Sequence, residues 1–131
     1  MPLQTGSWTA NVGGVPTQIQ ITGVDGRGNV SGNISGNSFS GFWNEDSQRI
    51  TFLLAPLTVG ENLSIQIFVG YLFTDPVNLT GASGTVFFTL TGYVEDFLTG
   101  VTANPAPPGL IGPPPSAKCS LFGWYAQIGV D

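Results

Sequence analysis

The sequence predicts an all-β protein, an eight-stranded antiparallel up-and-down β-barrel, and three observations support this fold class. Short segments alternate apolar and polar residues, which is the period of a strand with one buried face. Clusters of Gly, Asn, Asp and Pro separate these segments, and no segment carries apolar residues at helical spacing. The expected strands are even in number, so the sheet can close and leave no exposed edge. We expect one barrel domain, 1–131.

The N-terminal half predicts four short strands joined by tight turns. Between residues 17 and 22, Ile19 and Ile21 alternate with glutamines, so we expect the isoleucines inside and the glutamines outside. The sequence Asp25-Gly26-Arg27-Gly28 predicts a hairpin turn, because its glycines supply the positive φ that such turns need. The four expected strands are the segment from Thr5 to the turn Gly13-Gly14, then residues 17–22, 29–34 and 38–43.

The C-terminal half predicts four further strands, 49–57, 63–74, 85–96 and 120–131. Pro56 is expected to close the first of them or to mark a sheet edge, because proline cannot donate to the hydrogen-bond ladder. Residues 104–118 are dense in proline and are expected to form a crossover loop before the last strand. The alternative roles of this loop are a lid, a subunit contact or a docking segment for an aromatic groove.

Two long strands are apolar on both faces, which predicts self-association. Alternation places one set of large side chains opposite another: Tyr71, Phe73, Phe87 and Tyr93 against Phe68, Leu72, Phe88 and Leu90. One face fills the barrel, and the other would expose a large apolar patch unless a partner covered it. We therefore expect a homo-oligomer, a dimer or a tetramer.

Composition and charge argue against several classes of function. The net charge is −5 with three Lys and Arg residues, so nucleic acid and anionic membrane surfaces are not expected as partners. The chain lacks histidine, and its one cysteine, Cys119, cannot form an internal disulfide. Metal sites of His and Cys and nucleophiles activated by histidine are thereby excluded, and we expect no enzyme activity and no cofactor. The N-terminus shows no signal peptide, which makes a cytoplasmic location the default expectation.

Five segments carry a resemblance to a known family. They are the opening Gly6-Ser7-Trp8, the Gly-rich hairpin 24–32, the segments 40–44 and 68–71, and the last strand 124–131 with its Trp, Gly and Asp. These segments are similar to strands of avidin and streptavidin, whose fold is an eight-stranded barrel with a ligand cavity. The resemblance implies a small-molecule site inside the barrel.

The resemblance also implies which residues would face a ligand. The matching positions are Ala10, Val12, Gly14, Ile34, Ser64, Gln66, Phe68, Trp124 and Asp131. In the family, three side chains donate hydrogen bonds to the ureido oxygen of biotin, and Ala10, Gly14 and Ile34 stand at their positions without any donor. Each lost bond would cost about 1–3 kcal/mol, so biotin is not the expected ligand. Trp124 matches a tryptophan that, in the family, extends from one subunit into the ligand site of its neighbour.

Three functions follow for a non-catalytic barrel of this kind. The first is binding of a small apolar ligand other than biotin. The second is a structural or protein-interaction barrel whose interior is filled by side chains. The third is a carbohydrate-binding module that uses an exposed Trp43 and the loops rich in Asn and Ser. Trp8 is expected in the core, and Glu95 and Asp96, being adjacent, are expected on opposite faces of a strand.

Overall fold

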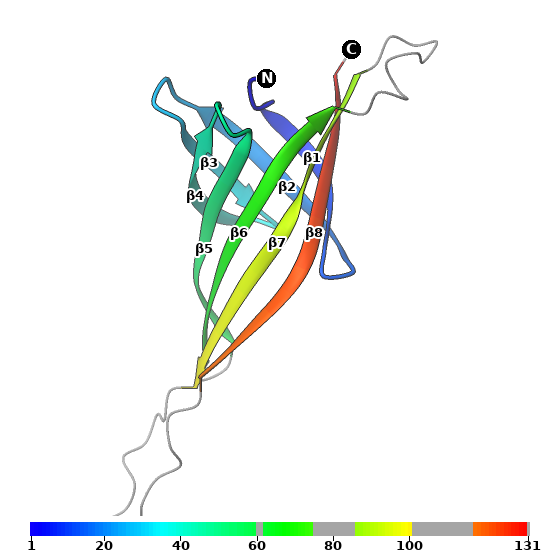
Figure 1. Cartoon of the computed structure of the whole chain (residues 1–131). Helices are drawn as coiled ribbons and strands as arrows, with labels where there is room; N and C mark the ends of the chain where they lie inside the picture. Colours follow the sequence, from blue (N-terminus) through cyan, green and yellow to red (C-terminus); the bar gives the residue numbers. More distant parts are fainter. Residues whose placement is uncertain (60–61, 75–85, 101–116, 131) are drawn as a thin grey trace, which may run out of the picture.

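The computed structural model is a closed barrel of eight antiparallel β-strands that follow one another in chain order (Figure 1). It describes residues 1–59, 62–74, 86–100 and 117–130. The strands are β1 (Gly6–Val12), β2 (Val15–Val24), β3 (Asn29–Ile34), β4 (Asn37–Asn44), β5 (Arg49–Val59), β6 (Asn62–Thr74), β7 (Val86–Gly100) and β8 (Ala117–Val130). In the part of the chain described, no helix is long and apolar enough to cross a membrane.

The predicted fold class and several predicted elements are confirmed. Ile19 and Ile21 are buried, whereas the glutamines beside them are exposed. The turn between β2 and β3 spans residues 25–28, and the N–H of Gly28 donates to the carbonyl oxygen of Asp25 at 3.1 Å. The bounds of β3 are those expected from the sequence.

Pro56 does not end β5, contrary to the expectation from sequence. The strand continues to Val59, and the register between β5 and β6 shifts between Leu54 and Leu57. Such an irregularity leaves residues out of the ladder, so a proline that lacks an N–H can be accommodated there.

The last two strands are longer than predicted. β7 runs on past Asp96 to Gly100, because its residues find partners on both β6 and β8. β8 begins at Ala117, so the final two residues of the expected loop 104–118 belong to a strand. Ala117 and Lys118 pair with β7, which they can do because no proline follows Pro115. The rest of that loop, residues 104–116, lies outside the described residues.

Strands β5 to β8 extend beyond the closed part of the barrel (Figure 1). β1 pairs with β8 only from Thr9 to Val12, where Val12 meets Trp124, whereas the ladder between β7 and β8 continues to Thr99 and Ala117. We call the continuation, residues 54–59, 62–67, 95–100 and 117–121, the four-strand extension. The extension begins near the β1–β2 turn and defines the open end of the barrel.

Four aromatic side chains, here called the aromatic cluster, fill the centre of the barrel. Phe52 stacks between Phe39 and Phe68, with ring centroids 4.3 Å and 4.5 Å apart. Trp124 meets Phe52 and Phe68 edge-on, at 5.7 Å and 5.6 Å. All four are buried, and such offset and T-shaped contacts are the favoured geometries for aromatic pairs.

Gly70 makes room for the indole of Trp124. Gly92 pairs with Gly70 on one side and with Trp124 on the other. A Cβ atom placed on Gly70 would lie 2.5 Å from Cζ2 of Trp124. The indole N–H donates to the carbonyl oxygen of Val69 at 3.0 Å, so its polar group is satisfied inside the barrel.

The structure also assigns the two apolar faces of β6 and β7. Phe68, Leu72 and Leu90 are buried inside, and Phe88 packs against the same core. Tyr71, Phe73 and Tyr93 are exposed on the outside.

Replacement of Gly70 by alanine should destabilise the barrel. The added methyl group would overlap the Trp124 indole, and overpacking of this kind costs about 1–3 kcal/mol. Gly23→Ala is the matched control, because a Cβ atom at Gly23 meets nothing within 4 Å. Urea unfolding of both variants measures the effect, and equal stabilities would contradict the packing described.

Candidate functional site

Four of the predicted ligand positions belong to the packed core. Ala10, Ile34, Phe68 and Trp124 are all buried among the large side chains of the barrel. Gly14, by contrast, lies in the exposed β1–β2 turn at a φ of +89°, and its N–H donates to Oδ1 of Asn11. Asp131 lies outside the described residues. The centre of the barrel therefore holds side chains at the positions where a ligand was expected.

The three tryptophans lie inside the barrel. Trp8 is fully buried, as expected, and its indole N–H donates to the carbonyl oxygen of Gln4 at 3.2 Å. Trp43 is only 5% exposed, so the exposed Trp43 on which the carbohydrate alternative depended is not found. Its N–H donates to Oε2 of Glu45 at 2.6 Å, which allows burial beside a polar turn. Trp124 is buried in its own barrel, where its indole N–H donates to the carbonyl oxygen of Val69.

A cavity of about 370 Å³ opens where the β1–β2 turn meets the four-strand extension, and we call it the open-end cavity. Its lining residues are Val12, Gly13, Val15, Gln66 and Phe122. The turn is held to β8 by a hydrogen bond from the N–H of Gly13 to the carbonyl oxygen of Gly123, at 3.0 Å. Two residues predicted from sequence, Val12 and Gln66, are thus brought together at one site.

A polar pair lies on the inner face of the extension beside this cavity. The hydroxyl of Ser64 is buried and donates to Oδ1 of Asp96 at 3.0 Å. Asp96 pairs across the strands with Gln66 and with Ser120. Ser64, Gln66 and Asp96 thus place polar groups next to the aromatic centre of the barrel.

Sequence reasoning missed Asp96, Phe122 and Gly13 at this end of the barrel. It placed Glu95 and Asp96 on opposite faces, which the buried Val94 and the contact with Ser64 agree with. The signal for Asp96 was the register: an inward Phe68 implies an inward Gln66, and the residue opposite Gln66 on β7 is Asp96. No pattern in the sequence reveals that register before the strands are paired.

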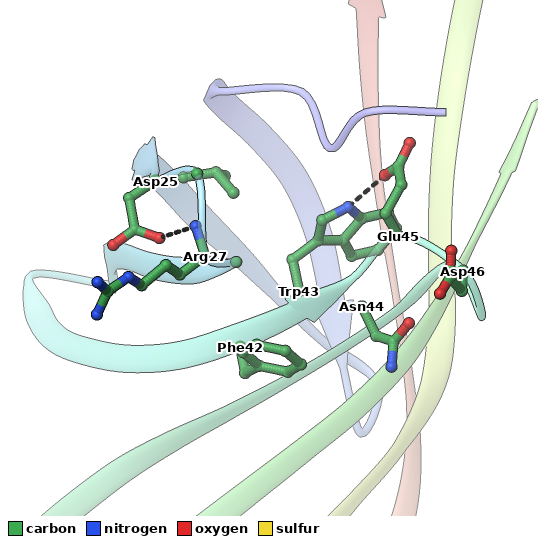
Figure 2. Close-up of a pocket in the computed structure, with 10 residues that line it drawn as sticks. Asp25, Arg27, Phe42, Trp43, Asn44, Glu45 and Asp46 are labelled. Carbon is green, nitrogen blue, oxygen red and sulfur yellow. Dashed lines mark hydrogen bonds between the residues drawn. The ribbon is translucent and has the colours of Figure 1, made fainter.

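A second pocket of about 380 Å³, the rim pocket, lies at the other end of the barrel (Figure 2). It is bounded by the β2–β3 turn with Asp25 and Arg27, and by residues 42–46 of β4 and the following turn. Figure 2 shows the two groups on either side of the pocket. Among the residues described, no three His, Cys, Asp or Glu side chains lie together in a way that could hold a metal ion.

Hydrogen bonds lower the pKa of two carboxyl groups at this rim. The side-chain amide of Asn29 and the N–H groups of Asn29 and Arg27 hold the pKa of Asp25 below its ordinary value of 3.8. The Trp43 indole lowers the pKa of Glu45, and the N-terminal ammonium, 3.1 Å away, acts in the same direction. Both carboxylates thus stabilise the turns that contain them.

The outer surface of β5–β8 is unusually apolar. We call it the outer apolar face, and its exposed members are Leu53, Ile65, Tyr71, Phe73, Tyr93, Leu121 and Tyr125. The side chains of Leu121, Tyr125 and Phe73 are 69%, 54% and 53% exposed. Cys119, a free and exposed thiol, lies on the same strand two residues from Leu121.

Acid should destabilise the protein through Asp25. Because its pKa is lower in the folded chain, the carboxylate stabilises the fold above the ordinary pKa, and this contribution is lost as the pH falls through the folded value. Asp25→Asn should therefore flatten the fall in unfolding free energy below about pH 5. Asn29→Ala should raise the Asp25 pKa, measured by NMR titration of the carboxyl carbon. A titration midpoint at or above 3.8 in the wild type would contradict this account.

Comparison of the chain with protein-family models, with curated proteins and with solved structures finds no match. The resemblance to avidin and streptavidin thus stays a prediction from the sequence. The fold rests on the strands, their registers and the closed barrel they form.

Proposed function

We propose that this chain is a non-catalytic binding barrel that takes a small, mostly apolar ligand at its open end. The observation that supports this proposal most is the open-end cavity of about 370 Å³, lined by Val12, Gln66 and Phe122 with the β1–β2 turn. Cavities of about 300–1,000 Å³ with apolar walls and a few polar groups are typical small-molecule sites.

The centre of the barrel is not proposed as the ligand site. The aromatic cluster occupies it, and a ligand there would have to displace rings that are buried and in mutual contact. Biotin is not proposed either, because Ala10 and Ile34 are core residues without donors and Gly14 lies in an exposed turn.

The lining favours a ligand with an apolar body and a small polar group. Val12, Val15 and Phe122 supply apolar surface, whereas Gln66 offers an amide that can both donate and accept. Next to Gln66, the hydroxyl of Ser64 donates a hydrogen bond to Oδ1 of Asp96, so that oxygen already has a partner. A polar group on the ligand would find Gln66 within the cavity itself.

Nile red, a neutral apolar dye, tests the cavity by its fluorescence. We expect the wild type to bind it and Gln66→Phe to weaken binding by at least about tenfold, because the larger ring fills space in the cavity. Gln18→Phe, at an exposed position of β2, is the control and should leave binding unchanged. Loss of binding in Leu121→Lys with full binding in Gln66→Phe would place the dye on the outer apolar face and overturn the proposal.

Calorimetric titration with biotin tests the ligand class. We expect no measurable heat of binding, because the three positions aligned with the ureido donors carry no donor. Sub-micromolar binding would contradict both this expectation and the placement of Gly14.

A second candidate function, self-association, is supported by the outer apolar face. Seven large apolar side chains are exposed on neighbouring strands, and large exposed apolar patches often mark protein–protein contacts. A barrel with a filled interior that associates through this face is the structural alternative for the chain. The occupant we propose is a second copy of the same chain.

The charges on this face favour a symmetric pairing. Among the side chains described on β5–β8, Arg49 and Glu95 are the charged groups that point outward. Arg49 pairs across the strands with Tyr71 and Glu95 with Ile67, so the two charges lie on either side of Val69. In a two-fold dimer centred near Val69, each Arg49 would meet Glu95 of the other copy.

Sedimentation velocity at micromolar concentration should show a dimer or a tetramer. Tyr93→Lys should shift the protein towards monomer, because burying a lysine in the apolar contact costs its desolvation. Gln20→Lys, at an exposed position on β2, serves as the charge-matched control. A wild type that sediments as a monomer would rule out this second function.

A further inference from the structure

The rim pocket lies at the opposite end of the barrel from the open-end cavity and has a different lining. One wall is the β2–β3 turn, the other is the turn after β4, and Phe42 and Trp43 lie between them (Figure 2). The pocket combines an aromatic ring with donors and acceptors.

Both walls are held in place by hydrogen bonds of their own. In the first wall, Oδ1 of Asp25 accepts from the N–H groups of Arg27 and Asn29, at 2.8 Å and 2.9 Å. In the second wall, Oδ1 of Asn44 accepts from the N–H of Ser47 at 3.1 Å, and Oε2 of Glu45 accepts from the Trp43 indole. The two walls are joined directly, because the backbone N–H of Trp43 donates to the carbonyl oxygen of Gly28 at 2.7 Å. The pocket is therefore pre-organised.

Phe42 supplies a fixed and accessible aromatic surface. Its side chain is 49% exposed, although it is a large apolar ring. The ring lies against the β2–β3 turn, where a Cβ atom on Gly28 would come within 2.9 Å of Cε2 of Phe42. Gly28 has a φ of +89°, so glycine is favoured there by its backbone as well as by the space. The sequence suggested Trp43 as the exposed ring, but in the structure Trp43 is buried and Phe42 is exposed.

Three polar groups of the lining remain available to hydrogen-bond a ligand. Arg27 uses its backbone N–H for Asp25, and in the part of the chain described its guanidinium has no hydrogen-bond or ion-pair partner. The side-chain NH₂ of Asn44 remains as a donor, since its oxygen is the atom that accepts from Ser47. The carboxylate of Asp46 adds an acceptor. Donors and an acceptor thus surround an aromatic ring.

We propose that the rim pocket binds a neutral saccharide, with one pyranose ring stacked on Phe42. The C–H bonds on one face of a pyranose carry partial positive charge and pack against the negative face of an aromatic ring. Hydroxyl groups on the sugar edge both donate and accept, which matches the guanidinium and amide donors and the Asp46 carboxylate. The volume of about 380 Å³ lies in the range of small-molecule sites.

Charge in the pocket disfavours an anionic ligand. The lining has three carboxylates, those of Asp25, Glu45 and Asp46, and a single guanidinium, so a phosphate or carboxylate ligand would meet net repulsion. Asp25 and Glu45 already accept hydrogen bonds from the protein, and Glu45 also faces the N-terminal ammonium. Asp46 alone remains to attract a cation, and choline tests that alternative.

An NMR titration of backbone amides tests this site. The probes are maltose, cellobiose and N,N′-diacetylchitobiose, with inorganic phosphate and choline as anionic and cationic comparators. We expect at least one disaccharide to shift amides within residues 25–29 and 42–47. Phe42→Ala should weaken its binding by at least about tenfold, which corresponds to the loss of an aromatic contact.

Two further variants separate binding from folding. Arg27→Met removes the guanidinium but keeps the N–H that Asp25 binds, so it should weaken saccharide binding without changing thermal stability. Phe73→Ala removes a similarly exposed ring on β6, outside the pocket, and should bind as the wild type does. Shifts with choline or phosphate alone, no shift with any disaccharide, or unchanged affinity in Phe42→Ala would each overturn the proposal.

Discussion

The contact between the Trp124 indole and Gly70 inside the barrel is the constraint on which the rest of the structure depends. Trp124 pairs with Val12 of β1 at the seam that closes the barrel, and its indole N–H reaches across to Val69 of β6. The ring fits because Gly70 carries no side chain there. Trp124 of β8 therefore connects β1, β6 and the aromatic cluster.

This filled centre decides where other molecules can bind. Each aromatic contact in the cluster contributes about 0.5–1.5 kcal/mol beyond the burial of its area, so opening the centre for a ligand would be costly. The two pockets to which we assign ligands, the open-end cavity and the rim pocket, lie at the two ends of the barrel. In the four-strand extension, Ser64 and Asp96 form a hydrogen bond on the inner face, whereas Ile65 and Leu121 are exposed on the outer face.

The strands could be predicted from sequence more fully than the site. Alternation around Ile19 and Ile21 and the glycines of the β2–β3 turn are local signals, and they sufficed for the first strands. Alternation alone leaves the orientation of β6 and β7 open, because both faces carry large apolar side chains. The resemblance to avidin and streptavidin placed Ser64, Gln66 and Phe68 on the inner face. In the structure, the same face of β6 carries Gly70, which leaves room for the Trp124 indole.

Two site residues were misjudged from the sequence for different reasons, Trp43 for a local one and Asp96 for a long-range one. Trp43 follows an exposed phenylalanine and precedes a polar turn, yet Glu45 satisfies its N–H and so allows burial. Asp96 faces inward through pairing with β6, a contact between residues far apart in the sequence. Such long-range registers are decided by the whole barrel, and a single segment does not contain them.

Hydrogen exchange at the Trp124 indole tests the central claim most directly. The indole N–H of Trp124 is bonded to a backbone carbonyl in a buried site, whereas that of Trp43 is bonded to an exposed carboxylate at the rim. NMR can follow the three indole protons separately in deuterated water. A filled barrel predicts that Trp124 exchanges only through global unfolding, more slowly than Trp43. Rapid exchange at Trp124 under native conditions would show that water reaches the centre, and would contradict the account.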